Sequence, residues 1–278
     1  MADLKVVTNH INENDNDDAS DSESELPWKK RFKMAPTSRR KLLVLCLGGL
    51  LVNRVYIRHR RSAPAPPLNP DVYTGSFAVF KRPFCTDFIK FCFERFELGI
   101  WSATVECNTE AVLKCIGGSE MKTKLAFVWG REECIDSGIA CQRNSQKPLF
   151  LKDLRRVWEK KYLDLPWRRG QYSQSNTLLI CVDPPTSLLN PPNTAIFPQP
   201  YKSHDMEDTF LGPDGELRGY LERIADVDNV PSYVKEHPFG QPAITPSHPD
   251  WNYYAKIVHE FQKEDNEKYQ QMKSIDLV

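Results

Sequence analysis

The sequence predicts an α/β fold in which helices flank a central parallel sheet. The main observation is the apolar run from Lys41 to Val52, which ends in a glycine-containing turn. A run that is apolar throughout, rather than alternating, is typical of a strand buried on both faces of a parallel sheet. Leu178–Val182 repeats this pattern, and segments with helical spacing of apolar residues lie between the two runs.

The remaining elements follow from periodicity and turn residues. A predicted helix at Thr86–Glu97 carries a stripe that we expect to pack into the core, formed by Phe84, Phe88, Phe91 and Arg95. The other predicted elements are strands at Val72–Phe80, Gly99–Trp101, Leu125–Trp129 and Leu178–Val182, and helices at Thr109–Ile116, Lys152–Lys161 and Gly215–Ala225.

Composition divides the chain into a tail, a domain and an extension. Residues 1–38 are acidic and then basic, with few apolar residues, and are predicted to be disordered. Residues 39–225 hold the predicted sheet and its helices, and residues 226–278 form a C-terminal extension. Within the extension, Ser247–Asp250 has the pattern of a helix start. The helix is expected to dock on the domain through Trp251, Tyr254, Val258 and Phe261.

The net charge is zero, but the charges are unevenly distributed. Residues 1–28 hold eight acids and one lysine, whereas residues 29–61 hold eleven lysines and arginines and no acid. The basic clusters Lys29–Lys33 and Arg39–Lys41 fit a nuclear-localisation signal, a patch for anionic surfaces or a solvated charge run. The acidic N-terminus predicts neither a secretory signal nor a mitochondrial transit peptide. We therefore expect a nuclear or nucleocytoplasmic protein, with mitochondrial location as the alternative.

The longest apolar run is too short for a membrane, since a spanning helix needs about 20 apolar residues. No transmembrane segment is therefore predicted, and nothing in the chain predicts direct recognition of nucleic acid. The eight cysteines include no C-x-x-C pair, so a structural zinc site has little support and reduced, mostly buried thiols are expected.

The run Lys41–Val52 resembles the signature of the haloacid-dehalogenase (HAD) superfamily, in the branch of the RNA-polymerase carboxy-terminal-domain phosphatases. That signature is a strand followed by Asp-x-Asp-x-Thr-Leu-Val. Here Cys46, Gly48 and Leu50 stand at the positions of the two aspartates and the threonine. The resemblance implies a HAD-like Rossmannoid fold and an active site that has lost its acids.

Three further segments resemble the later motifs of this branch. Leu98–Ala103 resembles the second motif and puts Ser102 at the phosphate-binding hydroxyl, and Lys147–Leu154 resembles the third and puts Lys152 at its lysine. Thr177–Pro184 resembles the fourth motif, where acids are expected near Cys181. The match spans about residues 39–225, and its local sequence is most similar to plant members. The import-receptor subunit of the mitochondrial inner-membrane translocase shares this domain.

In the family, one aspartate attacks phosphorus, the second acts as general acid and base, and magnesium neutralises the phosphoryl charge. Thiols and apolar side chains are poor ligands for magnesium, which prefers oxygen. With Cys46, Gly48, Cys181 and Val182 at the reacting and ligating positions, the magnesium site is predicted to be lost. Asp183 is a weak candidate ligand, and a turn residue before Pro184 is the favoured interpretation.

Ser102 and Lys152 are the two phosphate-binding residue types that remain, so an oxyanion is expected to bind weakly there and to the loop after Cys46. The favoured function is a catalytically degenerate pseudophosphatase that binds a protein or phosphopeptide. Two alternatives stay open: a protein Ser/Thr phosphatase with residual or rerouted activity, and an import-receptor-type translocase subunit.

In the family, the positions of Cys46 and Cys181 bind one metal ion, so the resemblance implies that the two cysteines face each other. Packed, reduced thiols are the favoured state of this pair. A reversible disulfide is one alternative. A soft-metal site is the other, although two thiolates fall short of the usual four zinc ligands.

Overall fold

The computed structural model describes residues 40–57, 69–142, 144–160 and 165–275. The predicted disordered tail, residues 1–38, lies outside these ranges. So does most of the proline-rich segment that precedes residue 70.

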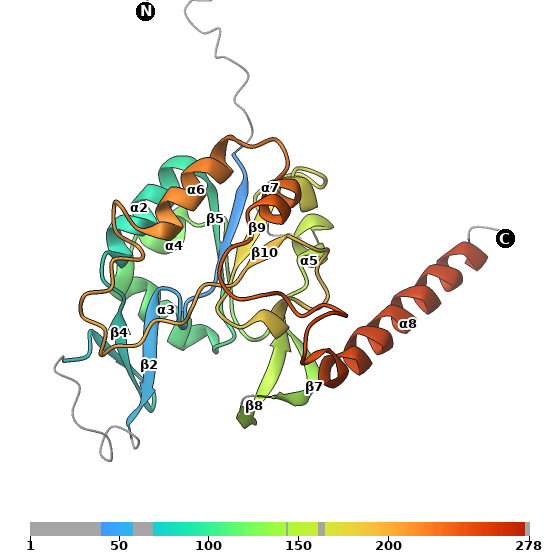
Figure 1. Ribbon diagram of the computed structural model, residues 1–278, viewed down its shortest axis with the longest axis horizontal. Coiled ribbons are helices and arrows are strands. Elements are labelled where there is room, and N and C mark those ends of the chain that lie inside the picture. The colour runs from blue at the N-terminus through green and yellow to red at the C-terminus, as the bar shows by residue number, and fades with distance from the viewer. Residues whose placement is uncertain (1–39, 58–68, 143, 161–164, 276–278) are drawn as a thin grey trace, which may run out of the picture. The chain divides into compact units, whose positions relative to one another are not determined.

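A five-stranded sheet with strand order β10-β9-β1-β5-β6 forms the centre of the domain, and all its strands are parallel (Figure 1). This confirms the predicted α/β class. The strands are β1 (Leu42–Leu45), β5 (Glu97–Trp101), β6 (Phe127–Trp129), β9 (Thr177–Ile180) and β10 (Ala195–Ile196).

Side chains alternate along these strands, and each face of the sheet has its own core. Leu43 and Leu45 of β1 pack on one face with Ile180 of β9. Leu42 and Val44 point to the other face, where they pack with Leu179. Because both faces are covered, β1 is buried along its whole length, as its apolar sequence predicts.

Helices cover the first face of the sheet, and a shorter layer covers the second. The first face is packed by α2 (Cys85–Arg95), α3 (Glu106–Gly117), α6 (Glu216–Asp226) and α7 (Val230–Glu236), with α4 (Met121–Lys124) beside α3. The second face is covered by α5 (Arg155–Trp158) and by buried residues between Leu165 and Tyr172. Figure 1 shows α2 and α6 side by side, in agreement with their contacts.

The domain also contains two antiparallel units, separate from the parallel sheet, that the sequence analysis did not predict as such. One is a three-stranded sheet of β2 (Val52–Tyr56), β4 (Phe77–Lys81) and β3 (Val72–Thr74). The predicted single strand Val72–Phe80 is therefore wrong: it is a hairpin that turns at Gly75, whose φ of +56° suits glycine. The other unit is the hairpin of β7 (Ile135–Cys141) and β8 (Asn144–Leu151).

Two helix predictions also need correction. The helix expected at Lys152–Lys161 is a single turn, α5, because Asp153 accepts from the Arg155 N–H at its start and Lys160 has a φ of +51° after its end. Phe84 does not belong to the buried stripe. It precedes α2 in a left-handed conformation and is 45% exposed, whereas Phe88 and Phe91 are buried as expected.

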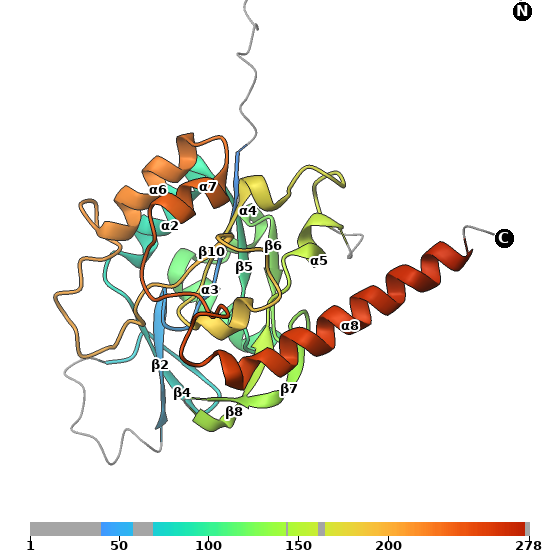
Figure 2. The same ribbon diagram turned by 45° about the vertical axis from the view of Figure 1, so that its right-hand side comes forward.

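The C-terminal helix α8 (Trp251–Ile275) docks on the β7–β8 hairpin. Tyr254 and Ile257 form a third, separate core cluster with Leu149 and Leu151 of β8. Of the residues expected on the docking face, Tyr254 and the partly buried Phe261 belong to this cluster, whereas Trp251 and Val258 do not. Figures 1 and 2 show the later turns of α8 extending past the hairpin. Among the described helices, none is long and apolar enough to cross a membrane.

Candidate functional site

The candidate site lies at the carboxyl ends of β1 and β9. The chain runs from β1 outward to β5 and β6 on one side, and later to β9 and β10 on the other. The order therefore reverses between β1 and β9, and open α/β sheets bind ligands beyond the strand ends at such a point. Leu45 pairs with Ile180 at the end of these two strands, so Cys46 and Cys181 are the next residues of each.

Cys46, Cys181 and Lys152 form a buried polar cluster at this point. The two thiols lie close enough to act on each other's pKa, and the Lys152 ammonium acts on that of Cys46. The Cys181 Sγ also lies 3.1 Å from the Thr186 hydroxyl. The prediction that the two cysteines face each other is confirmed, and both are free thiols.

The cluster favours a thiolate at Cys46. Burial alone would raise the pKa of this thiol, but the hydrogen bond from Cys181 and the charge of Lys152 lower it to about 7. The same hydrogen bond, together with burial, raises the pKa of Cys181. Burial opposes the charge of Lys152, yet the neighbouring thiols more than compensate and raise its pKa. Cys46 therefore ionises near pH 7, and its charged form lies beside a thiol donor and an ammonium group.

Backbone hydrogen bonds hold Lys152 in place. Its N–H donates to the Thr186 carbonyl at 2.7 Å, and its own carbonyl accepts from the Asn190 side chain at 2.8 Å. The side chain is only 3% exposed, so the ammonium is directed into the protein. Position 152 therefore serves as the counterion of a buried thiolate.

Ser102 directly follows β5, which lies on the other side of β1 from β9. Its hydroxyl accepts from the Thr104 N–H at 3.2 Å, which makes it part of a tight turn. The Cys134 thiol contacts the Ser102 carbonyl at 3.8 Å and lies within electrostatic range of Lys152. The structure thus places Ser102 beside the cluster.

The loop after Cys46 folds back on itself. The Leu47 carbonyl accepts from the N–H groups of Leu51 and Val52, while the Gly49 N–H donates to the Val52 carbonyl at 2.7 Å. The Cys46 N–H is also occupied, by the Ile180 carbonyl. The expected anion cradle therefore needs correction, because two of its N–H groups already have partners within the chain.

The two glycines of this loop differ in their surroundings. Gly49 has a φ of +79°, and a Cβ there would lie 2.6 Å from the Val182 side chain. Gly48 faces open space, and a Cβ there would meet nothing within 4 Å. The position that the resemblance assigns to the family's general acid is thus sterically free, while the following position requires glycine.

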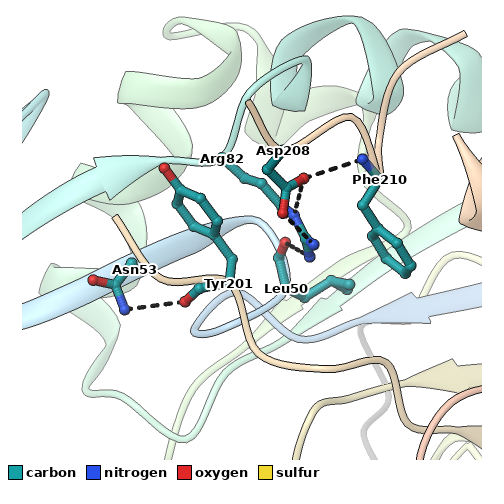
Figure 3. A network of polar contacts seen from close by, with 6 residues as sticks. All are labelled: Leu50, Asn53, Arg82, Tyr201, Asp208 and Phe210. Carbon is teal, nitrogen blue, oxygen red and sulfur yellow. Dashed lines mark hydrogen bonds and ion pairs between the residues drawn. The ribbon is translucent and has the colours of Figure 1, made fainter. Parts of the chain in front are cut away.

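A buried ion pair fixes the far side of the same loop (Figure 3). Arg82 binds both carboxylate oxygens of Asp208, at 2.9 and 2.7 Å, and its third guanidinium nitrogen contacts the Leu50 carbonyl at 3.4 Å. The guanidinium lies over the Phe210 ring at 4.3 Å. Tyr201 joins the assembly because its N–H donates to the Gly49 carbonyl at 2.7 Å.

Asp183 lies outside the thiol cluster. It precedes a 3-10 turn, Pro184–Ser187, and its carboxylate pairs with Lys147 at 3.6 Å. Asp183 is one of the residues that line a cavity of about 320 Å³. Other lining residues include Pro185, Gln199, Pro242, His248, Asp250 and Tyr254.

The donor set does not fit magnesium. Cys46 and Cys181 offer sulfur, Gly48 has no side chain, and Val182 presents only an apolar group. Magnesium requires hard oxygen ligands in nearly octahedral geometry. The one carboxylate among these motif positions, that of Asp183, is paired with Lys147. No step that depends on magnesium can therefore be derived for this site.

The parallel sheet, its switch point and the motif order define a HAD-like domain of the FCP1 type. The family model of the NLI interacting factor-like phosphatases matches residues 41–231, and the chain belongs to this family. An uncharacterized FCP1 homology domain-containing protein of Schizosaccharomyces pombe is 28% identical over 238 residues, which are 84% of each chain.

Two solved structures of related phosphatases are more distant. One is the fission yeast RNA polymerase II CTD phosphatase Fcp1 bound to beryllium fluoride, with 14% identity, a TM-score of 0.38 and coverage of 84% of this chain and 67% of the other. The second, also of Fcp1, has 14% identity, a TM-score of 0.39 and coverage of 85% and 66%.

Three residues of the site were not identified from the sequence: Thr186, Cys134 and Asp208. Thr186 anchors both Cys181 and Lys152, and Asp208 completes the ion pair with Arg82. Each acts through a contact between distant parts of the chain, which leaves no local pattern. The one local signal was the position of Thr186, two residues after the Asp183–Pro184 turn.

Proposed function

We propose that this chain is a catalytically degenerate member of its family that acts as a protein-binding module. One observation carries the proposal: Cys46, Cys181 and the buried Lys152 occupy the switch point where the family's chemistry needs carboxylates. A phosphoaspartate cannot form without the nucleophilic aspartate, and Gly48 has no proton to give a leaving group. Loss of all these parts leaves binding as the property that the fold retains.

Of the two ligand types expected from the sequence, the geometry favours a peptide without phosphate. Lys152 is buried and already paired with Cys46, so a phosphate group would have to displace the thiolate. The cavity is instead lined by prolines, Tyr254 and two acidic residues: Asp183, which pairs with the largely exposed Lys147, and Asp250, which lies beside His248. Such a pocket suits an extended segment with a basic side chain, because the charges are complementary.

The test uses full-length protein and two peptides of RNA polymerase II CTD repeats, one phosphorylated and one not, since the sequence motifs resemble those of the RNA-polymerase carboxy-terminal-domain phosphatases. A third, unrelated peptide rich in lysine and proline probes the cavity. Binding is followed by fluorescence anisotropy, with Asp250→Asn as the cavity variant and the exposed Glu236→Gln as its control. We expect peptide binding that weakens in the cavity variant only. Equal binding by both variants, or binding of phosphopeptide alone, contradicts the cavity assignment.

Activity is tested separately with an aryl phosphate and magnesium. We expect no turnover above that of Lys152→Ala. Turnover that a chelator abolishes would contradict the non-catalytic assignment.

A second candidate, a phosphatase with a rerouted mechanism, is favoured by the lowered pKa of Cys46, since a thiolate is a nucleophile. Its signature is turnover that survives the chelator and is lost in Cys46→Ser. Nuclear location remains a prediction from the basic clusters, and the import-receptor alternative remains a hypothesis from the resemblance alone. Imaging the tagged full-length chain in cells distinguishes these two locations.

A further inference from the structure

The register of the central sheet brings two cysteines to adjacent positions on one face. Leu45 and Ile180 are paired in parallel β1 and β9, and Cys46 and Cys181 follow them directly. Neighbouring strands lie about 4.7–4.9 Å apart. This spacing falls within the Cα separation of about 4.4–6.8 Å that disulfides adopt. Both side chains belong to the same core cluster, so they point to the same side of the sheet.

The two thiols differ in access and in surroundings. Cys46 retains 7% of its surface and contacts Lys152, whereas Cys181 is 1% exposed and contacts Thr186. Cys46 is therefore the thiol that a small reagent reaches first, and it is also the one whose charged form has a counterion. The buried Cys92 differs from Cys46, because burial outweighs the charges of Arg218 and Arg95 there and raises its pKa.

We propose that Cys46 and Cys181 form a redox-modification site, in which a hydroperoxide converts the reduced pair to a disulfide. This inference goes beyond the binding function and does not depend on it. In the first step the Cys46 sulfur attacks the terminal peroxide oxygen and the O–O bond breaks, so Cys46 sulfenic acid forms and the other oxygen leaves as an alkoxide (hydroxide from hydrogen peroxide) that takes a proton from water. In the second step the Cys181 sulfur attacks the Cys46 sulfur and its proton leaves with the hydroxyl group as water. Two thiols lose two electrons, and one hydroperoxide is reduced to water and a hydroxyl compound.

Oxidation changes the electrostatics of the site. The reduced pair carries the negative charge that faces Lys152, and a disulfide carries none. The ammonium then remains buried without a counterion, which costs free energy unless an anion replaces the thiolate. The oxidised protein should therefore bind sulfate more tightly than the reduced protein does.

The experiment treats the full chain with hydrogen peroxide, blocks remaining thiols and maps disulfides in the digest by mass spectrometry. The expected result is one linkage between the peptides of Cys46 and Cys181, with a loss of two hydrogen atoms that dithiothreitol reverses. Cys181→Ser should instead leave a sulfenic acid at Cys46 that a 1,3-diketone probe captures. Cys107→Ser, which removes an exposed thiol, should behave as the wild type.

A variant of Lys152 tests the role of the counterion. Lys152→Met should slow oxidation of Cys46 by roughly tenfold or more, since less of the thiol is ionised. Its fold is checked by circular dichroism before use. If Cys46 and Cys181 of the wild type both remain open to alkylation after peroxide has oxidised Cys107, the proposal is wrong. Disulfides spread evenly over the other cysteines would overturn it as well.

Discussion

Arg82 and Asp208 lie 126 positions apart in the chain and form a bidentate ion pair, with both side chains less than a tenth exposed. The pair connects the start of α2 to the segment before α6. Because Arg82 also contacts the Leu50 carbonyl, it holds the loop that follows the central strand (Figure 3). This loop carries Gly48, at the position that the resemblance assigns to the family's general acid, so the ion pair holds the geometry of the candidate site.

Removing one partner of this pair should strongly destabilise the protein. Arg82→Met leaves the Asp208 carboxylate buried without its counterion, and such changes cost about 3–5 kcal/mol of unfolding free energy. Lys81→Met is the matched control, since the pair of Lys81 with Asp71 is about a third exposed and should contribute under about 1 kcal/mol. Urea denaturation measures both, and similar losses for the two variants would contradict the assignment.

The two neighbouring glycines of the loop should respond differently to alanine. Gly49→Ala forces a side chain into a left-handed conformation and against Val182, and we expect a loss of about 1–3 kcal/mol. Gly48→Ala meets no neighbour and should stay within about 0.5 kcal/mol of the wild type. Thermal unfolding compares them, and equal stability would show that the loop adapts.

Docking of α8 should depend on one buried aromatic residue. Tyr254→Ala removes the largest side chain between α8 and β8, at a cost of about 3–5 kcal/mol to the local packing. Amide hydrogen exchange should then accelerate in β7 and β8 more than in β1. The exposed neighbour Asn252→Ala serves as control and should leave exchange unchanged.

Stability should depend on pH through the Cys46 thiolate. Its folded pKa of about 7 lies below the ordinary value of 9.0, so the thiolate stabilises the fold at pH above that ordinary value. The contribution, on the order of 2 kcal/mol, shrinks as pH falls and is gone below about pH 7. The groups that act on Cys46 are Cys181, Lys152 and, with the opposite sign, Asp183. Denaturant titrations of the wild type and Cys46→Ser should diverge above pH 7 and coincide below it.

Restoring activity should require several changes together. Asp must return at positions 46, 48 and 181, because nucleophile, acid and metal ligand act as a unit and their losses are not additive. We expect magnesium-dependent hydrolysis of an aryl phosphate from the triple variant Cys46→Asp/Gly48→Asp/Cys181→Asp and none from the three single variants. Activity in any single variant would contradict this prediction, because one carboxylate would then suffice for hydrolysis.

The sequence predicted the parts of the fold that depend on local pattern. Buried apolar runs identified β1 and β9, and the family resemblance correctly placed Cys46 next to Cys181. The hairpins were missed because their strands are short or interrupted by turn residues, as at Gly75 and Gly138. Partners such as Asp208 come from distant segments, and single-sequence patterns do not encode which carboxylate will reach which guanidinium.

The third core cluster connects α8 to the candidate site, although the two are far apart in the sequence. Leu151 packs against Tyr254 and Ile257 of α8, and Lys152 is the next residue in the chain. Cleavage of α8, a partner that binds its docked face or a charge added near Tyr254 should weaken its packing on β8. The end of β8 then becomes less ordered, and with it the position of the Lys152 ammonium. We therefore expect changes in the C-terminal helix to alter the position of Lys152 beside the two cysteines.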